Sequence, residues 1–236
     1  MLIYLEQTDS TNDALKKLLE HKKLEKGSIL YTDYQTIGRG QSNTVWESEP
    51  NKNLLMSMVL YPTIKPEQQF LISKLISIAI IDYLKEIHTF ALKWPNDIYA
   101  EGKKIGGLLI EYSWLGKNLE YVVVGLGLNV NQEIFKNENA ISLKLIKKVD
   151  FQIKDLIICL QAHILRWLDC FELKEKAIHQ KYQDALIYYQ QKHLFTLPSG
   201  EKFNGIFNKI NQNGSIEILH LEENKTNTYT NKEIKF

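Results

Sequence analysis

The chain has 236 residues, of which 44% are hydrophobic and 24% are charged, as expected for a globular protein able to bury a core. Its 29 basic residues nearly balance 28 acidic ones, which argues against nucleic acid or an anionic membrane as the main partner. The longest apolar stretch, residues 70–84, is interrupted by polar residues and is too short to cross a bilayer. Met1 is not followed by the pattern of a signal peptide, so we expect a cytoplasmic protein.

The first two thirds of the sequence predict strands that alternate with helices. Residues 2–5 form a strand, and Asp9-Ser10-Thr11-Asn12 provides capping side chains for the helix that follows. Further strands are expected at 28–34, 53–61, 90–93, 105–112 and 119–130, with helices over 70–87 and around 156–171. This pattern predicts an α+β fold, in which a mixed sheet carries helices on a face.

After about Ala185 the sequence changes to short strands separated by turns. Asn213-Gly214, flanked by alternating apolar residues, is a strong hairpin signal because both positions accept positive φ. We therefore expect two closely packed domains, a larger one over residues 1–184 and a small β-barrel over residues 185–236.

Three segments combine residues that suit an anionic ligand better than a core. The first is residues 35–46, where Gly38 and Gly40 flank Arg39. Glycines let a backbone approach a ligand closely, and a guanidinium can bind phosphate or carboxylate oxygens with two hydrogen bonds. An anion-binding loop and an ordinary turn remain equal alternatives from this segment alone, which also lacks the usual nucleotide-binding fingerprints.

The second segment is Lys93-Trp94-Pro95-Asn96-Asp97, followed by residues 104–111. A lysine at the end of an apolar strand, held by a proline turn, can stabilise negative charge that develops at phosphorus or carboxyl centres. In the third segment, Gly125 and Gly127 alternate along an apolar strand and clear one face for a backbone or a flat ligand. By the same alternation, Asn129 is predicted to point into the cleared space.

Together these segments, with Asp9-Ser-Thr-Asn12, resemble the bacterial biotin protein ligase family. The resemblance implies a catalytic domain related to class II aminoacyl-tRNA synthetases, followed by an SH3-like C-terminal domain. It also implies the short form of the family, without the N-terminal DNA-binding domain, because the Ser-Thr-Asn motif begins at residue 10. Such a member activates biotin with ATP and Mg²⁺ to biotinyl-5'-AMP, and transfers biotin to a lysine on the biotin carboxyl carrier domain of an acyl-CoA carboxylase.

The same resemblance implies the site residues. The predicted biotin-binding residues are Ser10, Thr11, Asn12, Gln35, Gly38, Arg39, Gly40, Gln41, Lys93 and Gly107. The predicted ATP-binding residues are Arg39, Gln41, Trp46, Lys93, Asn96 and Asn129. Arg39 and Lys93 are the expected catalytic pair, which holds the two anionic reactants together while magnesium is bound mainly by the phosphates; no protein ligand set for a metal is predicted.

The sequence also departs from the family pattern. Gln41 stands where arginine is common in the family, and Thr44 where a basic or amide residue is frequent. Asn43 and Asn51 stand where the family often has glycine. Fewer cations are therefore expected to face the ATP phosphates. Residues 230–233 fit the family's closing Gly-Glu turn poorly.

Two other functions fit parts of this sequence. One is a lipoate–protein ligase of related fold, and the other is a non-catalytic module that binds biotin or a peptide. An exposed strand edge near residues 119–130 is expected to pair two copies in a homodimer or to meet the carrier.

Overall fold

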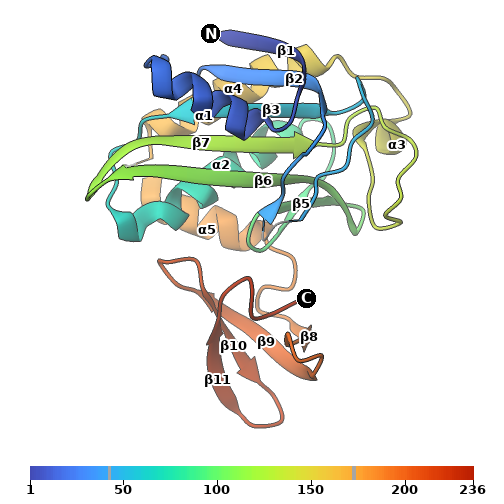
Figure 1. Ribbon diagram of the computed structural model, residues 1–236. Helices are drawn as coiled ribbons and strands as arrows, with labels where there is room; N and C mark the ends of the chain where they lie inside the picture. The colour runs from blue at the N-terminus through green and yellow to red at the C-terminus, as the bar shows by residue number, and fades with distance from the viewer. Residues whose placement is uncertain (42–43, 172–173) are drawn as a thin grey trace.

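A seven-stranded mixed sheet forms the centre of the larger part of the protein (Figure 1). The computed structural model describes residues 1–41, 44–171 and 174–236, so Asn43 lies outside the described residues. The strands are β1 (Leu2–Thr8), β2 (Ile29–Gln35), β3 (Leu54–Leu60), β4 (Ala91–Lys93), β5 (Asp97–Ala100), β6 (Lys103–Leu115) and β7 (Asn118–Leu128). They lie in the order β1-β2-β3-β7-β6-β5-β4. Only β1 and β2 of this sheet are parallel, and the predicted mixed α+β fold is confirmed.

Helices cover both faces of this sheet. On one face α2 (Gln69–Leu84) packs against α4 (Ile153–Asp169) and α5 (Glu175–Ala185), and on the other lies α1 (Thr11–His21) (Figure 1). The short η2 (Pro66–Gln68) precedes α2, and α3 (Leu143–Lys147) follows β7. None of the helices described is long and apolar enough to span a membrane.

The two-residue period of β7 separates two hydrophobic cores. Val122 and Val124 belong to the large core that includes residues of α2 and α4, whereas Val123 packs in a smaller core with Leu15 of α1. Continued along the strand, the same alternation puts Gly125 and Gly127 on the side of α1. Strand β7 therefore carries no side chain on this face just beyond the helix.

The C-terminal residues form a second, four-stranded antiparallel sheet. Its strands are β8 (Lys192–Thr196), β9 (Lys202–Ile210), β10 (Ile216–His220) and β11 (Lys225–Tyr229), in the order β11-β10-β9-β8. The predicted hairpin at Asn213-Gly214 is confirmed, with Gly214 at φ +88° between β9 and β10. This sheet fits the expected SH3-like fold.

Two local predictions are wrong. The strand over residues 119–130 is not an edge, because β7 lies between β3 and β6 and its residues 122–128 pair with both neighbours. Ser10 occupies the N-cap position of α1, but its side chain makes no capping hydrogen bond. Ser10 instead lines the cavity described below.

Candidate active site

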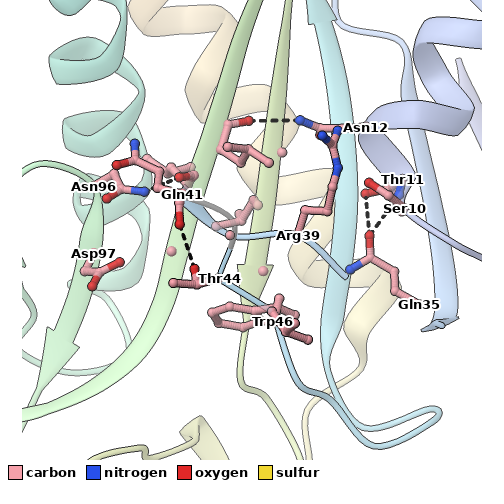
Figure 2. Close-up of a pocket in the computed structure, with 18 of the residues that line it drawn as sticks. Ser10, Thr11, Asn12, Gln35, Arg39, Gln41, Thr44, Trp46, Asn96 and Asp97 are labelled. Atoms are coloured by element: carbon pink, nitrogen blue, oxygen red, sulfur yellow. Dashed lines mark hydrogen bonds between the residues drawn. The ribbon is translucent and has the colours of Figure 1, made fainter. Parts of the chain in front are cut away.

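A cavity of about 390 Å³ lies over the glycine face of the main sheet (Figure 2). Its walls come from the start of α1, the 35–46 loop, the β4–β5 turn, the middle of β6 and β7, and the C-terminal segment. The lining residues are Ser10, Thr11, Asn12, Gln35, Arg39, Gly40, Gln41, Thr44, Val45, Trp46, Met56, Pro95, Asn96, Asp97, Lys104, Gly107, Leu108, Leu109, Gly125, Leu126, Gly127, Asn231 and Lys235. The fold thus brings together segments that are up to 225 residues apart, from Ser10 to Lys235.

The two glycines of β7 allow side chains to lie directly on the sheet. A Cβ atom at Gly127 would stand 2.5 Å from a ring carbon of Trp46, and one at Gly125 would stand 2.4 Å from Oδ1 of Asn12. Any larger residue would displace the indole or the amide. The glycine pattern found in the sequence therefore provides the floor of the cavity.

A buried network of polar side chains forms the end of the cavity nearest α1. Gln35 accepts hydrogen bonds at Oε1 from the backbone N–H of Thr11 (2.8 Å) and from its hydroxyl (3.1 Å). Because Oε1 is used in this way, the amide nitrogen of Gln35 is left on the cavity side (Figure 2). Ser10, Thr11 and Asn12 are each at most 4% exposed, so this end can discriminate between hydrogen-bonding ligands.

Ser57 belongs to this network and was not predicted. It is the single polar residue of β3, is fully buried, and lies 2.7 Å from the Thr11 hydroxyl and 2.5 Å from Oδ1 of Asn12. A lone hydroxyl in the apolar run Leu54–Leu60 was the signal that could have revealed it. Ser57 does not line the cavity, but it fixes two side chains that do.

Arg39 lines the cavity, as predicted, and is held by carboxylates. Its guanidinium lies 2.7 Å from Asp13 and 3.3 Å from Glu111, and Lys16 bonds to Glu111 at 2.9 Å. Burial acts to raise the pKa of Glu111, but hydrogen bonds from Lys16 and Asn12 hold it below its ordinary value. Glu111 is therefore ionised at neutral pH and holds Arg39 beside the cavity.

Lys93 is not among the lining residues. Its ammonium packs over the rings of Tyr99 (5.6 Å to the centroid) and Phe236 (5.9 Å), and burial lowers its pKa despite the nearby carboxylate of Asp97. The reason is topological: β4 is the far edge strand, with β5 and β6 between it and the glycine floor of β7. The predicted convergence of Arg39 and Lys93 is therefore not observed.

Lys104 lies in the cavity instead. It stands near the start of β6, the strand next to β7, with its ammonium 2.6 Å from Asp97 and 5.8 Å from the centroid of the Trp46 ring. A Cβ atom at Gly107 would stand 3.6 Å from the same ammonium, so Gly107 also shapes this wall. In the sequence Lys104 stands two residues before the pair Gly106-Gly107, and this position beside two glycines is the signal that could have revealed it.

Two further predicted residues lie outside the lining. Asn129 is 4% exposed and donates its amide N–H to the carbonyl of Ile141, because β7 ends at Leu128 and the strand alternation stops there. Gly38 is buried behind Trp46, where a Cβ atom would stand 2.6 Å from the Trp46 carbonyl oxygen. The other predicted residues all line the cavity: Ser10, Thr11, Asn12, Gln35, Arg39, Gly40, Gln41, Trp46, Asn96 and Gly107.

The C-terminal segment adds two lining residues that were not predicted. Asn231 donates a hydrogen bond to the side-chain oxygen of Gln41 (2.9 Å), and Lys235 adds a third cation to the wall. Strand β8 supports Lys235, because Thr196 and Lys235 exchange backbone hydrogen bonds. The second sheet is thus attached to residues of the cavity.

Comparison with known proteins gives a consistent result. The bifunctional ligase/repressor BirA of Bacillus subtilis is 33% identical over 134 residues, which are 56% of this chain and 41% of that protein. The biotin--[acetyl-CoA-carboxylase] ligase of Mycobacterium tuberculosis is 31% identical over 133 residues, 53% of this chain and 48% of that protein. The chain thus spans less than half the length of these curated relatives.

A solved structure matches nearly the whole chain. The biotin protein ligase of Aquifex aeolicus, determined in complex with biotin and ATP, superposes with a TM-score of 0.78 at 28% identity, covering 99% of this chain and 97% of that one. Residues 4–129, more than half of the 236, match the family described as biotin/lipoate A/B protein ligases. The chain therefore belongs to the biotin/lipoate A/B protein ligase family.

Proposed function

We propose that this protein is a biotin protein ligase that forms biotinyl-5'-AMP from biotin and ATP and transfers biotin to a lysine of a carrier protein. The observation that carries the proposal is the cavity itself, in which cations from separate segments, Arg39 and Lys104, line a glycine-floored space. The Aquifex aeolicus enzyme, whose structure contains biotin and ATP, supports this choice of substrates.

The polar end of the cavity suits the ureido ring of biotin. That ring presents one carbonyl acceptor and two N–H donors, and the site offers the Gln35 amide nitrogen as a donor and the Ser10 and Thr11 hydroxyls as acceptors. The indole of Trp46 provides a flat apolar wall beside Gly127. Among the described residues, the buried Trp46 Nε1 has no hydrogen-bond partner, so a ligand acceptor at this point would satisfy it.

Activation requires the carboxylate of biotin to approach the α-phosphate of ATP. Both groups are anionic, so cations fixed beside them reduce the repulsion and stabilise the crowded phosphorus centre. We assign this role to Lys104 in place of Lys93, together with Arg39, which we expect to exchange Asp13 for a ligand oxygen when the anions bind. Gln41, Asn96 and Lys235 then lie where the nucleotide is expected.

Magnesium, which neutralises phosphate oxygens, fits the cavity only as an ion bound mainly by the substrate. Within the described residues, no group of three or more possible ligands from His, Cys, Asp and Glu is present. Of the described residues that line the cavity, Asp97 alone carries a carboxylate, and its oxygen pairs with Lys104. We therefore expect Asp97 to contribute at most one ligand.

The domain boundary, the carrier and the location remain parts of this proposal. We assign residues 1–184 to catalysis and residues 185–236 to an SH3-like domain, and we expect a biotin carboxyl carrier domain as the acceptor in the cytoplasm. A homodimer also stays a prediction, for which β1, an edge strand of the main sheet, is available in place of β7.

The decisive experiment measures both half-reactions. The purified protein is incubated with ATP, magnesium and either biotin or lipoic acid, and ATP–pyrophosphate exchange is followed. Mass spectrometry of a biotin carboxyl carrier domain then reports acyl transfer. Exchange and carrier modification with biotin are expected; exchange with lipoic acid alone would favour the lipoate ligase, and tight biotin binding without ATP use would favour a binding module.

A further inference from the structure

A second cavity, of about 270 Å³, lies beside the first, at the junction of the main sheet and the C-terminal sheet. Gln41, Pro95, Asn96, Leu108 and Asn231 line both cavities. The two spaces therefore adjoin along these shared residues, and the activation chemistry assigned above takes place in the first.

Two hydrogen bonds between loops of the larger part and loops of the C-terminal part fix the second cavity. Trp94 donates its indole N–H to the carbonyl of Gly214 (2.9 Å), and Asn231 donates to Gln41 (2.9 Å). Gly214 also packs closely on Phe70, since a Cβ atom there would stand 2.6 Å from the ring. The cavity is thus a built feature of the junction between the sheets.

The lining of the second cavity differs in charge from that of the first. Along the part that the structure describes, its residues are apolar, such as Phe70 and Ile110, or carry hydroxyl and amide groups, such as Ser73 and Ser77. No described lining residue is charged, whereas the first cavity has Arg39 among its cations. A phosphate or pyrophosphate would find no counter-charge here, and an ammonium ion would find no carboxylate.

We propose that the second cavity is the channel through which the acceptor lysine of the carrier reaches the acyl-adenylate, an inference that rests on the proposed function. The apolar walls suit the four methylene groups of a lysine side chain, and the hydroxyl oxygens accept hydrogen bonds from its amine. Desolvation without a carboxylate partner favours the neutral amine, which is the nucleophile.

The amine emerges between Pro95 and Asn96 at the edge of the first cavity. There its lone pair attacks the acyl carbon of biotinyl-AMP and a C–N bond forms. The bond from the acyl carbon to the phosphate oxygen breaks, AMP leaves with that electron pair, and the amine nitrogen releases one proton to water. The product is an amide, and no further reactant is needed.

Blocking the channel tests the proposal. Ser73→Phe places a ring in the cavity from α2, and Asn213→Trp does so from the opposite wall, where the side chain of residue 213 is exposed. Gln69→Phe is the matched control, because it adds the same ring to α2 at a half-buried residue that lines neither cavity. The measurements are biotin-dependent ATP–pyrophosphate exchange and single-turnover transfer from enzyme-bound biotinyl-AMP to a carrier domain.

The ratio of the transfer rate to the exchange rate is expected to fall at least about tenfold in both blocking variants. In the control it should stay within about twofold of the wild type. Unchanged transfer, or a parallel loss of both half-reactions, overturns the channel. If the wild-type protein shows no exchange with biotin, the proposed function fails first, and this result is visible before any variant is compared.

Discussion

Replacement of Lys104 by alanine tests the central assignment of the site. A cation about 4 Å from a developing negative charge, in surroundings with an effective dielectric constant of about 20, is worth roughly 4 kcal/mol. The side chain of Lys104 is 33% exposed, so solvent screening reduces this value. The usual loss for one preorganised group, about 2.7–4 kcal/mol or a hundred- to a thousand-fold in rate, is therefore the expected range.

The fold should survive this change. The ion pair of Lys104 with Asp97 is partly exposed on both sides, and such pairs contribute about 0–1 kcal/mol to stability. The assay is biotin-dependent ATP–pyrophosphate exchange, with thermal unfolding as the check on folding. Lys93→Ala is the matched control, because that lysine does not line the cavity and should retain exchange within about threefold of the wild type.

The opposite ranking would refute the reasoning. If Lys93→Ala abolishes exchange while Lys104→Ala does not, the cation that acts on the carboxylate comes from β4, and the cavity described here is not the site of activation.

Three further predictions follow from the geometry. Ser57→Ala should weaken biotin binding roughly tenfold, because loss of this buried hydroxyl frees the side chains of Thr11 and Asn12. Calorimetry measures the binding, and the KM for ATP in the exchange assay should stay unchanged. Gly127→Ala should displace the indole of Trp46 and lower the affinity for biotin by about tenfold or more. A biotin titration monitored by tryptophan fluorescence measures this affinity. An unaltered affinity would contradict the role of Gly127 in the cavity floor. Burial lowers the pKa of Lys74 to about 8, so below that pH the folded protein carries a buried charge, and its stability should rise between pH 8 and pH 10.5. Lys74→Met should raise the melting temperature at pH 7 and remove that rise, as thermal unfolding at pH 7 and pH 9.5 would show.

The order of the elements was largely predictable, because it depends on local patterns. Gly125 and Gly127 alternate within the apolar run of β7, and apolar residues recur with a helical period in α4. Asn213-Gly214 has the conformational freedom that its turn requires. These conformational preferences depend on residues close together in the chain, so the helices, strands and turns that they favour can be predicted from the sequence. The short strand β5 was missed because only four residues form it, within a motif that predicts a turn.

The motifs also located most of the cavity, since ten of the predicted site residues line it. What they could not decide was which of two lysines points into it. Lys93 and Lys104 are both close to glycine- or proline-containing turns, and nothing local distinguishes them. The choice depends on the order of strands in the sheet, which sets β6 beside β7 and β4 at the edge.

The amino-acid sequence by itself therefore determined the fold class, the hairpin of the second sheet and the segments that carry the chemistry. Only the tertiary structure decided that Lys104 lines the cavity and Lys93 does not, that Ser57 supports the polar end, and that Asn231 and Lys235 complete the wall. The physical reason is that these relations join residues far apart in the chain. Strand pairing and packing of the two sheets bring them together, and neither is a property of any single segment.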